Sequence, residues 1–309
     1  MDAVVLAGGF ATRLWPITKK RAKPLLPLGS KKIVDYTLEP LEQEKRIDNI
    51  YLSTNKRFKH DFQKHIEERG YQKTEVVIED SKKEEEKQGA IAALYQVIEQ
   101  KNPNSSLLVA AGDNYVSFKI QDFIDYYQKN SSPLIAAYDV PRDEASQYGI
   151  LELDGEKVTD FVEKPQKPPS TLAGIAYYIY TKEEIQLLNK YIEEGNNPDS
   201  PGYFIEWLLE RQHLRAYKFS GEWFDIGTPK GYLRANKTIL ATKNILENTE
   251  TTNSELKNVF ATNSQIKESS LNNCIILENS KIKESNLKNV IVDGASIENQ
   301  KVKDYQIIN

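Results

Sequence analysis

Short apolar runs alternate with segments of helical period through the first 140 residues of the chain. The runs have the length of β-strands, and most are followed by a segment in which apolar residues recur every three or four positions. A strand that is repeatedly followed by a helix is typical of a doubly wound α/β sheet. We expect strands at residues 2–7, 49–54, 75–79, 106–113 and 133–140. We expect helices at residues 31–43, 56–69, 88–100 and 121–129.

Ligands of such sheets bind at the carboxyl ends of the strands. Glycine-rich or polar residues follow three of the expected strands, so these positions are candidates for a binding site. They are Ala7-Gly8-Gly9, Ser53-Thr54-Asn55 and Gly112-Asp113.

The middle of the chain, residues 148–226, has an antiparallel pattern. Two β segments flank Asp154-Gly155, a dipeptide that favours a tight hairpin turn. We expect a second hairpin within residues 214–227 and a closing helix at residues 229–244. Together with the alternating part, this predicts a Rossmann-like, doubly wound mixed sheet in a first domain of residues 1–245.

The tail repeats itself. The stretches "IKESSLNNCIIL" and "IKESNLKNVIV" begin at Ile266 and Ile282, 16 residues apart, and Leu256, Leu271 and Leu287 keep the same spacing within one residue. Single aliphatic residues that recur among polar ones are typical of a β-solenoid, whose short coils stack their aliphatics on one another. The alternative is a polar, disordered tail, which would not keep such a register. We predict a short solenoid over residues 251–309, with Cys274 packed inside it.

Composition excludes several classes of function. The net charge is −4 and the pI is about 5.7, which argues against a general nucleic-acid binder. No apolar run is long enough to span a membrane, and the chain begins directly with a strand rather than an export signal, so we expect neither membrane nor export. A single cysteine fits a cytoplasmic location. No Cys/His cluster has zinc spacing, and we expect His60 and His65 on the solvated face of a helix.

The stretch "LAGGFATRLWPITKKRAKPLLPLG", which begins at Leu6, has the chemistry of a phosphate-binding loop. It lacks the Gly-Lys-Ser/Thr end of a P-loop and the spaced glycines of the dinucleotide fingerprint. Paired glycines after a strand nevertheless let backbone N–H groups approach an anion, and Arg13 and Lys23 add positive charge. We interpret Lys19, Lys20 and Arg21 as a solvated basic run.

This loop resembles the signature of the sugar-1-phosphate nucleotidyltransferases, also called NDP-sugar pyrophosphorylases. The resemblance continues in order through Pro229, over six motifs, and the tail resembles the left-handed β-helix that many members carry. The later motifs are "AAGDN" at Ala110, "YGILEL" at Tyr148, "FVEKP" at Phe161, "AGIAYYIY" at Ala173 and "WFDIGTP" at Trp223. The opening segment and "FVEKP" are most similar to those of glucose-1-phosphate thymidylyltransferases.

The resemblance implies a fold of the nucleotide-diphospho-sugar transferase type, followed by a short left-handed β-helix. It also implies a reaction in which a nucleoside triphosphate and a sugar 1-phosphate give an NDP-sugar and pyrophosphate, with Mg²⁺ as cofactor. The implied metal ligands are Asp113 and Asp225, and the implied catalytic residues are these two with Arg13, Lys23 and Lys164. The implied nucleotide-binding residues are Leu6, Ala7, Gly8, Gly9, Ala11, Thr12, Arg13, Gln88 and Gly89. The implied sugar-phosphate residues are Tyr148, Gly149, Glu163, Lys164 and Gly174.

Two departures from the family pattern concern the nucleotide. Ala11 stands where the family usually has glycine, and we expect it to cost little if its φ is negative. The stretch "KKEEEKQGAIAAL" keeps Gly89 but not the threonine of the usual base-reading pattern. The base therefore stays open among thymidylyl-, uridylyl-, adenylyl- and guanylyltransferases.

Two other functions are alternatives. A non-catalytic nucleotide-sugar sensor or assembly subunit would share the fold but would need neither metal aspartate. A solenoid acyltransferase would need a histidine in the tail, and none lies beyond His213. We expect the tail to be a contact of a homo-oligomer or a stabilising cap, so that deleting residues 251–309 would change assembly or heat stability before chemistry.

Overall fold

The computed structural model describes residues 1–79 and 89–309. Within them the chain forms two compact units. The first consists of Met1–Gly9, Thr37–Gly112 and Val116–Trp223, and the second of Phe10–Tyr36, Asp113–Tyr115 and Phe224–Asn309. The sequence predicts a different division, into domains 1–245 and 251–309, and that division stays a prediction.

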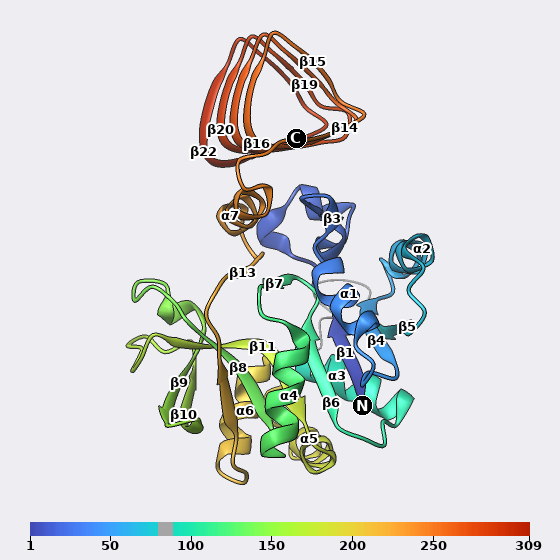
Figure 1. Ribbon diagram of the computed structural model, residues 1–309, viewed down its shortest axis with the longest axis vertical. Helices are drawn as coiled ribbons and strands as arrows, with labels where there is room; N and C mark the ends of the chain where they lie inside the picture. Colours follow the sequence, from blue (N-terminus) through green and yellow to red (C-terminus); the bar gives the residue numbers. More distant parts are fainter. Residues whose placement is uncertain (80–88) are drawn as a thin grey trace. The chain divides into compact units, whose positions relative to one another are not determined.

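The first unit contains a mixed sheet, which agrees with the predicted α/β class (Figure 1). Its four leading strands are parallel, and the middle of the chain adds antiparallel neighbours beside β6 and β8, as the sequence pattern predicted. In spatial order the strands are β5 (Thr74–Glu79), β4 (Ile50–Asn55), β1 (Asp2–Leu6), β6 (Leu107–Ala111), β11 (Leu172–Tyr180), β8 (Leu134–Asp139), β12 (Arg215–Lys218), β10 (Lys157–Glu163) and β9 (Gly149–Asp154).

Helices connect these strands. They are α1 (Asp35–Gln43), α2 (Lys59–Arg69), α3 (Ala90–Lys101), α4 (Ile120–Asn130), α5 (Lys182–Glu193) and α6 (Pro201–Leu209). The core of the unit joins the apolar faces of α3, α5 and α6 to the sheet, through side chains such as Val4, Leu94, Leu188 and Phe204.

Two expectations about this unit were wrong. Residues 214–227 do not form a hairpin, because β12 pairs with β8 and β10, whereas β13 (Trp223–Asp225) pairs with β7 (Asn114–Val116). The segment between β12 and β13 is hydrogen-bonded to Ser117 instead, through Ser117 N–Glu222 O at 2.9 Å and Glu222 N–Ser117 Oγ at 2.8 Å. His65 is buried with the apolar face of α2, its ring edge-on to Tyr71, whereas His60 is exposed as expected.

The second unit contains the loop of residues 10–36, helix α7 (Pro229–Leu240) and the repetitive tail. The loop folds into short 3-10 turns at Thr12–Leu14, Ile17–Lys19 and Lys23–Leu25 and a small β2–β3 pair (Pro27–Leu28 and Lys31–Lys32). The tail makes two parallel sheets whose strands alternate along the chain, which gives stacked coils (Figure 1). One sheet holds β14 (Ile245–Glu247), β16 (Glu255–Thr262), β18 (Ser270–Leu277), β20 (Asn286–Asp293) and β22 (Lys301–Ile308). The other holds β15 (Glu250–Thr252), β17 (Gln265–Lys267), β19 (Lys281–Lys283) and β21 (Ser296–Glu298).

The register of the coils agrees with the predicted repeat. Leu256 lies opposite Leu271, and Leu271 lies opposite Leu287. Cys274 is fully buried in the same stack, and burial raises the pKa of its thiol to about 12, so it is a packed core thiol as predicted. The corners of the coils require left-handed backbone, which explains why the tail is rich in asparagine. The corner residues with positive φ are Asn248, Asn253, Asn258, Asn263, Glu268, Asn273, Asn279, Glu284, Asn289, Gly294, Asn299 and Asp304.

Candidate functional site

The glycine pair after β1 is held by backbone and side-chain hydrogen bonds. Ala7 N donates to Ser53 O and Asn55 Nδ2 donates to Gly8 O, both at 2.8 Å. Leu6, the last residue of β1, pairs with Ala111 of β6, so the glycines follow a strand inside the parallel part of the sheet. A Cβ at Gly9 would meet nothing within 4 Å, so the backbone there is open to a bound molecule.

Glu79, which the sequence analysis did not single out, lies against the first of these glycines. A Cβ at Gly8 would fall on the Glu79 carboxylate, whose Oε1 accepts a hydrogen bond from Ser53 Oγ at 2.8 Å. Burial raises the pKa of this carboxyl, and the bond from Ser53 offsets only part of the rise. The position of Glu79 at the carboxyl end of an expected strand was a usable signal, since ligands bind at such ends.

The backbone of Ala11 does not meet the condition under which alanine would cost little at this position. Its φ is 51° and its ψ 49°, which is the left-handed region, and Thr18 Oγ1 donates to its carbonyl at 2.8 Å. The condition of a negative φ is therefore not met, and Ala11 adopts the conformation that glycine, unlike alanine, adopts without cost. The turn continues through Thr12, whose carbonyl accepts from Trp15 N, and it leaves Thr12 and Arg13 exposed.

Lys23 is buried and forms an ion pair with Asp113. Asn114 Nδ2 also donates to Asp113 Oδ1 at 2.9 Å. Burial acts to raise the pKa of the Asp113 carboxyl, but Lys23 outweighs it, so the pKa lies below its ordinary value and the group is a carboxylate. The two residues come from distant parts of the chain, and the fold brings them together.

Asp225 ends β13 next to Asp113. The strand after Asp113 pairs with β13, and Ile226 N donates to Asp113 O at 3.3 Å. A Cβ at Gly227 would lie 3.2 Å from both carboxylate oxygens of Asp225 and 3.0 Å from Arg13 Nη2, so this glycine makes room for both charged groups. Arg13, Lys23, Asp113 and Asp225 thus all belong to the second unit.

These residues fit a Mg²⁺ ion. Magnesium takes one or two carboxylates and completes its shell with phosphate oxygens and water. Asp113 and Asp225 supply two carboxylates, of which Asp113 also pairs with the Lys23 ammonium. In the part of the chain that the structure describes, no group of three or more His, Cys, Asp or Glu residues could hold a metal by itself.

The "FVEKP" motif forms a second charged group, in the first unit. The Glu163 side chain is buried and its Oε1 accepts from Ser200 Oγ at 2.9 Å and lies 3.1 Å from Lys164 Nζ. Ser200 is also the N-cap of α6, so the carboxylate lies at the positive end of a helix. Lys164 has a φ of 48°, a left-handed conformation that is uncommon for lysine and concentrates at functional sites.

Gly149 and Gly174 make room for side chains of the protein itself. A Cβ at Gly149 would lie 2.2 Å from the Phe161 ring, and one at Gly174 would lie 2.7 Å from Ile135. Gly202 of α6, which the sequence analysis missed, makes the same kind of room for the Glu163 carboxylate. The predicted approach of a sugar to bare backbone at these glycines stays a prediction.

Two further predicted residues have structural partners in the first unit. The Tyr148 ring packs edge-on to Trp223, with centroids 5.0 Å apart. Gly89 has a φ of 94° and lies so close to Pro198 O that a Cβ there would clash. Gln88 lies outside the described residues. The predicted nucleotide and sugar contacts of these residues stay predictions.

The basic run before Lys23 is not uniformly solvated. Lys20 is exposed and Lys19 Nζ lies over the Trp15 ring. Arg21, however, donates from Nη1 to both oxygens of Asp293, at 2.9 and 2.8 Å, and its Nη2 lies 3.5 Å from Glu278. The prediction for Arg21 was wrong because its main partner, Asp293, lies 272 residues away along the chain.

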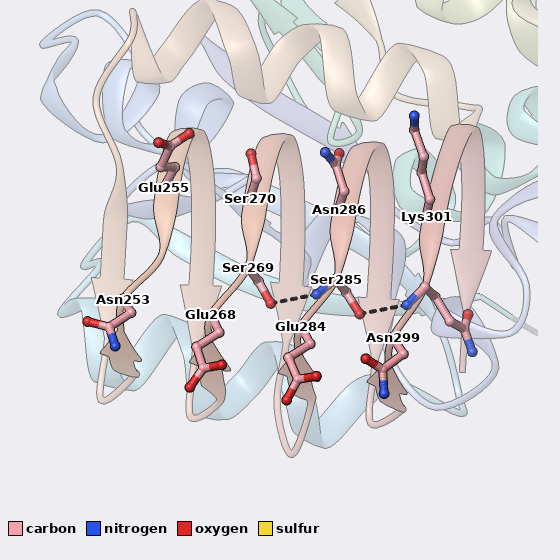
Figure 2. A pocket seen from close by; sticks show the side chains of 11 residues that line it. Asn253, Glu255, Glu268, Ser269, Ser270, Glu284, Ser285, Asn286, Asn299 and Lys301 are labelled. Atoms are coloured by element: carbon pink, nitrogen blue, oxygen red, sulfur yellow. Dashed lines mark hydrogen bonds between the residues drawn. The ribbon is translucent and has the colours of Figure 1, made fainter.

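A shallow groove follows one corner of the coils (Figure 2). The side chains of Glu268 and Glu284 point along the same side of this corner. Ser269 Oγ accepts from Ser285 N, and Ser285 Oγ accepts from Gln300 N, each at 3.1 Å. These hydroxyls link consecutive coils, so the groove is explained by the construction of the stack.

Comparisons with known proteins point to one family. A protein-family model described as "Nucleotidyl transferase" matches residues 2–242. A Sulfolobus acidocaldarius protein assigned as a mannose-1-phosphate guanyltransferase is 32% identical over 79% of this chain. The glucose-1-phosphate adenylyltransferase of Thermotoga neapolitana is 32% identical over 76% of it. The chain spans only 64% and 59% of the length of these two relatives.

Solved structures are similar as well. A Bacillus anthracis protein assigned as a glucose-1-phosphate thymidylyltransferase, crystallised with sucrose, aligns with a TM-score of 0.68 and 26% identity, over 77% of this chain and 95% of its own. A UDP-glucose pyrophosphorylase complexed with UDP-glucose aligns with a TM-score of 0.63 at 22% identity, over 76% of this chain and 96% of its own, which is a likeness of fold. No helix among the described residues is both long and apolar enough to cross a membrane.

Proposed function

Because the chain belongs to the nucleotidyl transferase family, we propose that it transfers a nucleotidyl group from a nucleoside triphosphate to a sugar 1-phosphate and releases pyrophosphate. The observation that carries the proposal is the joint placement of Lys23, Asp113 and Asp225 in the second unit. An in-line attack on the α-phosphorus needs positioning and charge neutralisation more than a covalent nucleophile. Two carboxylates for a metal and a buried lysine beside them meet that need.

Each group has a distinct role in this proposal. Asp113 and Asp225 would hold Mg²⁺, which supplies charge neutralisation to the phosphates when it is bound. Lys23 and the exposed Arg13 would bind phosphate oxygens as charge moves onto the pyrophosphate. Lys164 would bind the phosphate of the sugar substrate, and Glu163 would accept hydrogen bonds from sugar hydroxyls. The backbone of Leu6, Ala7, Gly8 and Gly9, with Ala11, Thr12, Gln88 and Gly89, would contact the nucleotide, while Tyr148, Gly149 and Gly174 would border the sugar.

We take dTTP and glucose 1-phosphate as the first substrate pair, because the loop and "FVEKP" resemble those of thymidylyltransferases. Relatives assigned to guanylyl and adenylyl transfer keep uridylyl, adenylyl and guanylyl transfer open as alternatives. We also propose that the coils are a left-handed β-helix and that the protein works in the cytoplasm as a homo-oligomer.

The test of the metal site is substitution of its carboxylates. Asp113→Asn and Asp225→Asn should each lower Mg²⁺-dependent pyrophosphate release by about 100-fold or more, because each removes a metal ligand. Asp143→Asn, at an exposed carboxylate, is the matched control and should keep wild-type activity. Full activity in both site variants would refute the metal site. If the wild-type protein binds a nucleoside triphosphate but releases no pyrophosphate, the non-catalytic sensor is favoured instead.

A further inference from the structure

The coils and the loop of residues 10–36 share one apolar core. Leu14, Leu26 and Ile33 of the loop belong to the same buried cluster as Phe260, Ile275 and Ile291 of the coils. Helix α7 contributes Tyr232 and Leu233 to this cluster, and Tyr232 Oη donates to Pro27 O of the loop. The loop that carries Arg13 and Lys23 therefore packs against the coils through a shared apolar cluster.

Arg21 ties this loop to two neighbouring coils, chiefly to Asp293. Nη1 of the Arg21 guanidinium donates to both oxygens of the Asp293 carboxylate. Glu278 adds a second negative charge 3.5 Å from Nη2. The Asp293 side chain is only 10% exposed, and that of Arg21 is 31% exposed. A partly desolvated arginine–carboxylate pair fixes both the position and the orientation of the arginine side chain. An exposed pair, by contrast, contributes little to stability.

The anchor lies two residues before Lys23. Only Ala22, which is buried in an extended conformation, separates Arg21 from the 3-10 turn that begins at Lys23. Lys23 in turn pairs with Asp113. A short chain of contacts therefore runs from Asp293 through Arg21 to Lys23 and Asp113.

We propose that Arg21 is a positioning residue, through which the coil at Asp293 holds Lys23 in place for the phosphates of the nucleoside triphosphate. The inference rests on the proposed function and deepens it. It assigns the tail a part in substrate binding, where the sequence analysis expected only assembly or heat stability. Asp293 and Arg21 touch no substrate in this scheme; they act through Lys23.

Steady-state kinetics with both substrates test the proposal. Asp293→Asn and Arg21→Gln should each raise the KM for the nucleoside triphosphate about 10-fold, while the KM for the sugar 1-phosphate changes less than about two-fold. The matched control is Glu298→Gln, which removes the exposed Lys283–Glu298 pair of the same coils, 2.7 Å long, and should leave both KM values unchanged. The double variant Arg21→Asp with Asp293→Arg should recover much of the lost affinity, because it restores the pair with its charges exchanged.

A purely structural pair would give a different result. Asp293→Asn would then lower the melting temperature but leave both KM values unchanged at a temperature where the variant is folded, and that outcome overturns the proposal. Hydrogen–deuterium exchange gives a readout without turnover: Asp293→Asn should speed exchange at residues 12–29, and Glu298→Gln should not. If the wild type releases no pyrophosphate, the proposed function fails while the exchange result still decides whether Arg21 couples the coil to the loop. Unchanged exchange in Asp293→Asn refutes the coupling.

Discussion

Ala11 has a strained backbone conformation and lies in the loop that is proposed to bind the nucleotide. An L-residue in the left-handed region costs about 1–2 kcal/mol relative to its preferred conformations. The hydrogen bond from Thr18 to its carbonyl and the buried Leu14 that follows hold the turn in this shape. The sequence identified Ala11 as unusual but could not give its φ, which depends on the packing of the whole loop.

Substituting glycine at Ala11 should therefore stabilise the fold. The gain from relieved strain is about 1–2 kcal/mol, and the greater freedom of glycine in the unfolded chain removes about 0.4–1 kcal/mol of it. We expect Ala11→Gly to raise the free energy of unfolding by about 0.5–1 kcal/mol in urea titrations. Ala22→Gly, at a φ of −63° in the same loop, should lower it. Destabilisation by Ala11→Gly would show that the left-handed turn is not strained.

Glu79 makes stability depend on pH. Its pKa in the folded state is raised, so the folded protein holds this proton more tightly than the unfolded chain does. Stability then falls as pH rises from the ordinary glutamate pKa of about 4.3 through the raised value. Glu79→Gln has no carboxyl to ionise at this position, so it should have a higher free energy of unfolding than the wild type at pH 8. The difference between the two proteins should shrink toward pH 4. Thermal melts of the two proteins over that range check it, and an advantage that grows on acidification would contradict the assignment.

At the scale of elements, the sequence was most informative where structure repeats. The coil register followed from Leu256, Leu271 and Leu287 because each coil reuses the same inward position and the same asparagine corners. The supposed hairpin at residues 214–227 failed for the opposite reason. A strand's partner is chosen by the whole sheet, and here the intervening segment bonds to Ser117, about 100 residues away.

The coils also allow a prediction at this scale. Leu271 is buried between Leu256 and Leu287, so Leu271→Ala should leave a cavity and lower the free energy of unfolding by about 2–5 kcal/mol. Leu246→Ala is the control, because Leu246 of β14 is 39% exposed. It should lower the free energy of unfolding by much less than Leu271→Ala does. Equal, small effects in chemical denaturation would mean that the coils are not a close-packed stack.

At the scale of the whole molecule, the sequence predicted the α/β class and the order of the motifs but not how the chain is divided. The loop of residues 10–36, Asp113 and the tail belong to one compact unit although they are far apart in sequence. No local pattern reveals such grouping, since it depends on contacts such as Arg21 with Asp293. Gly202 was missed for the same reason, because its role depends on the distant Glu163 carboxylate, whereas the position of Glu79 at the end of an expected strand was a signal that could have been used.

The proposed function requires that the chain join a nucleotide to a sugar phosphate. The decisive measurement is pyrophosphate release by the wild-type protein, with dTTP, UTP, ATP and GTP each paired with glucose, mannose and N-acetylglucosamine 1-phosphates. We predict release that requires Mg²⁺ and both substrates, strongest for one pair, with an NDP-sugar formed in equal amount. Absence of pyrophosphate release for every pair, or release that continues without the sugar phosphate, would contradict the proposed nucleotidyl transfer.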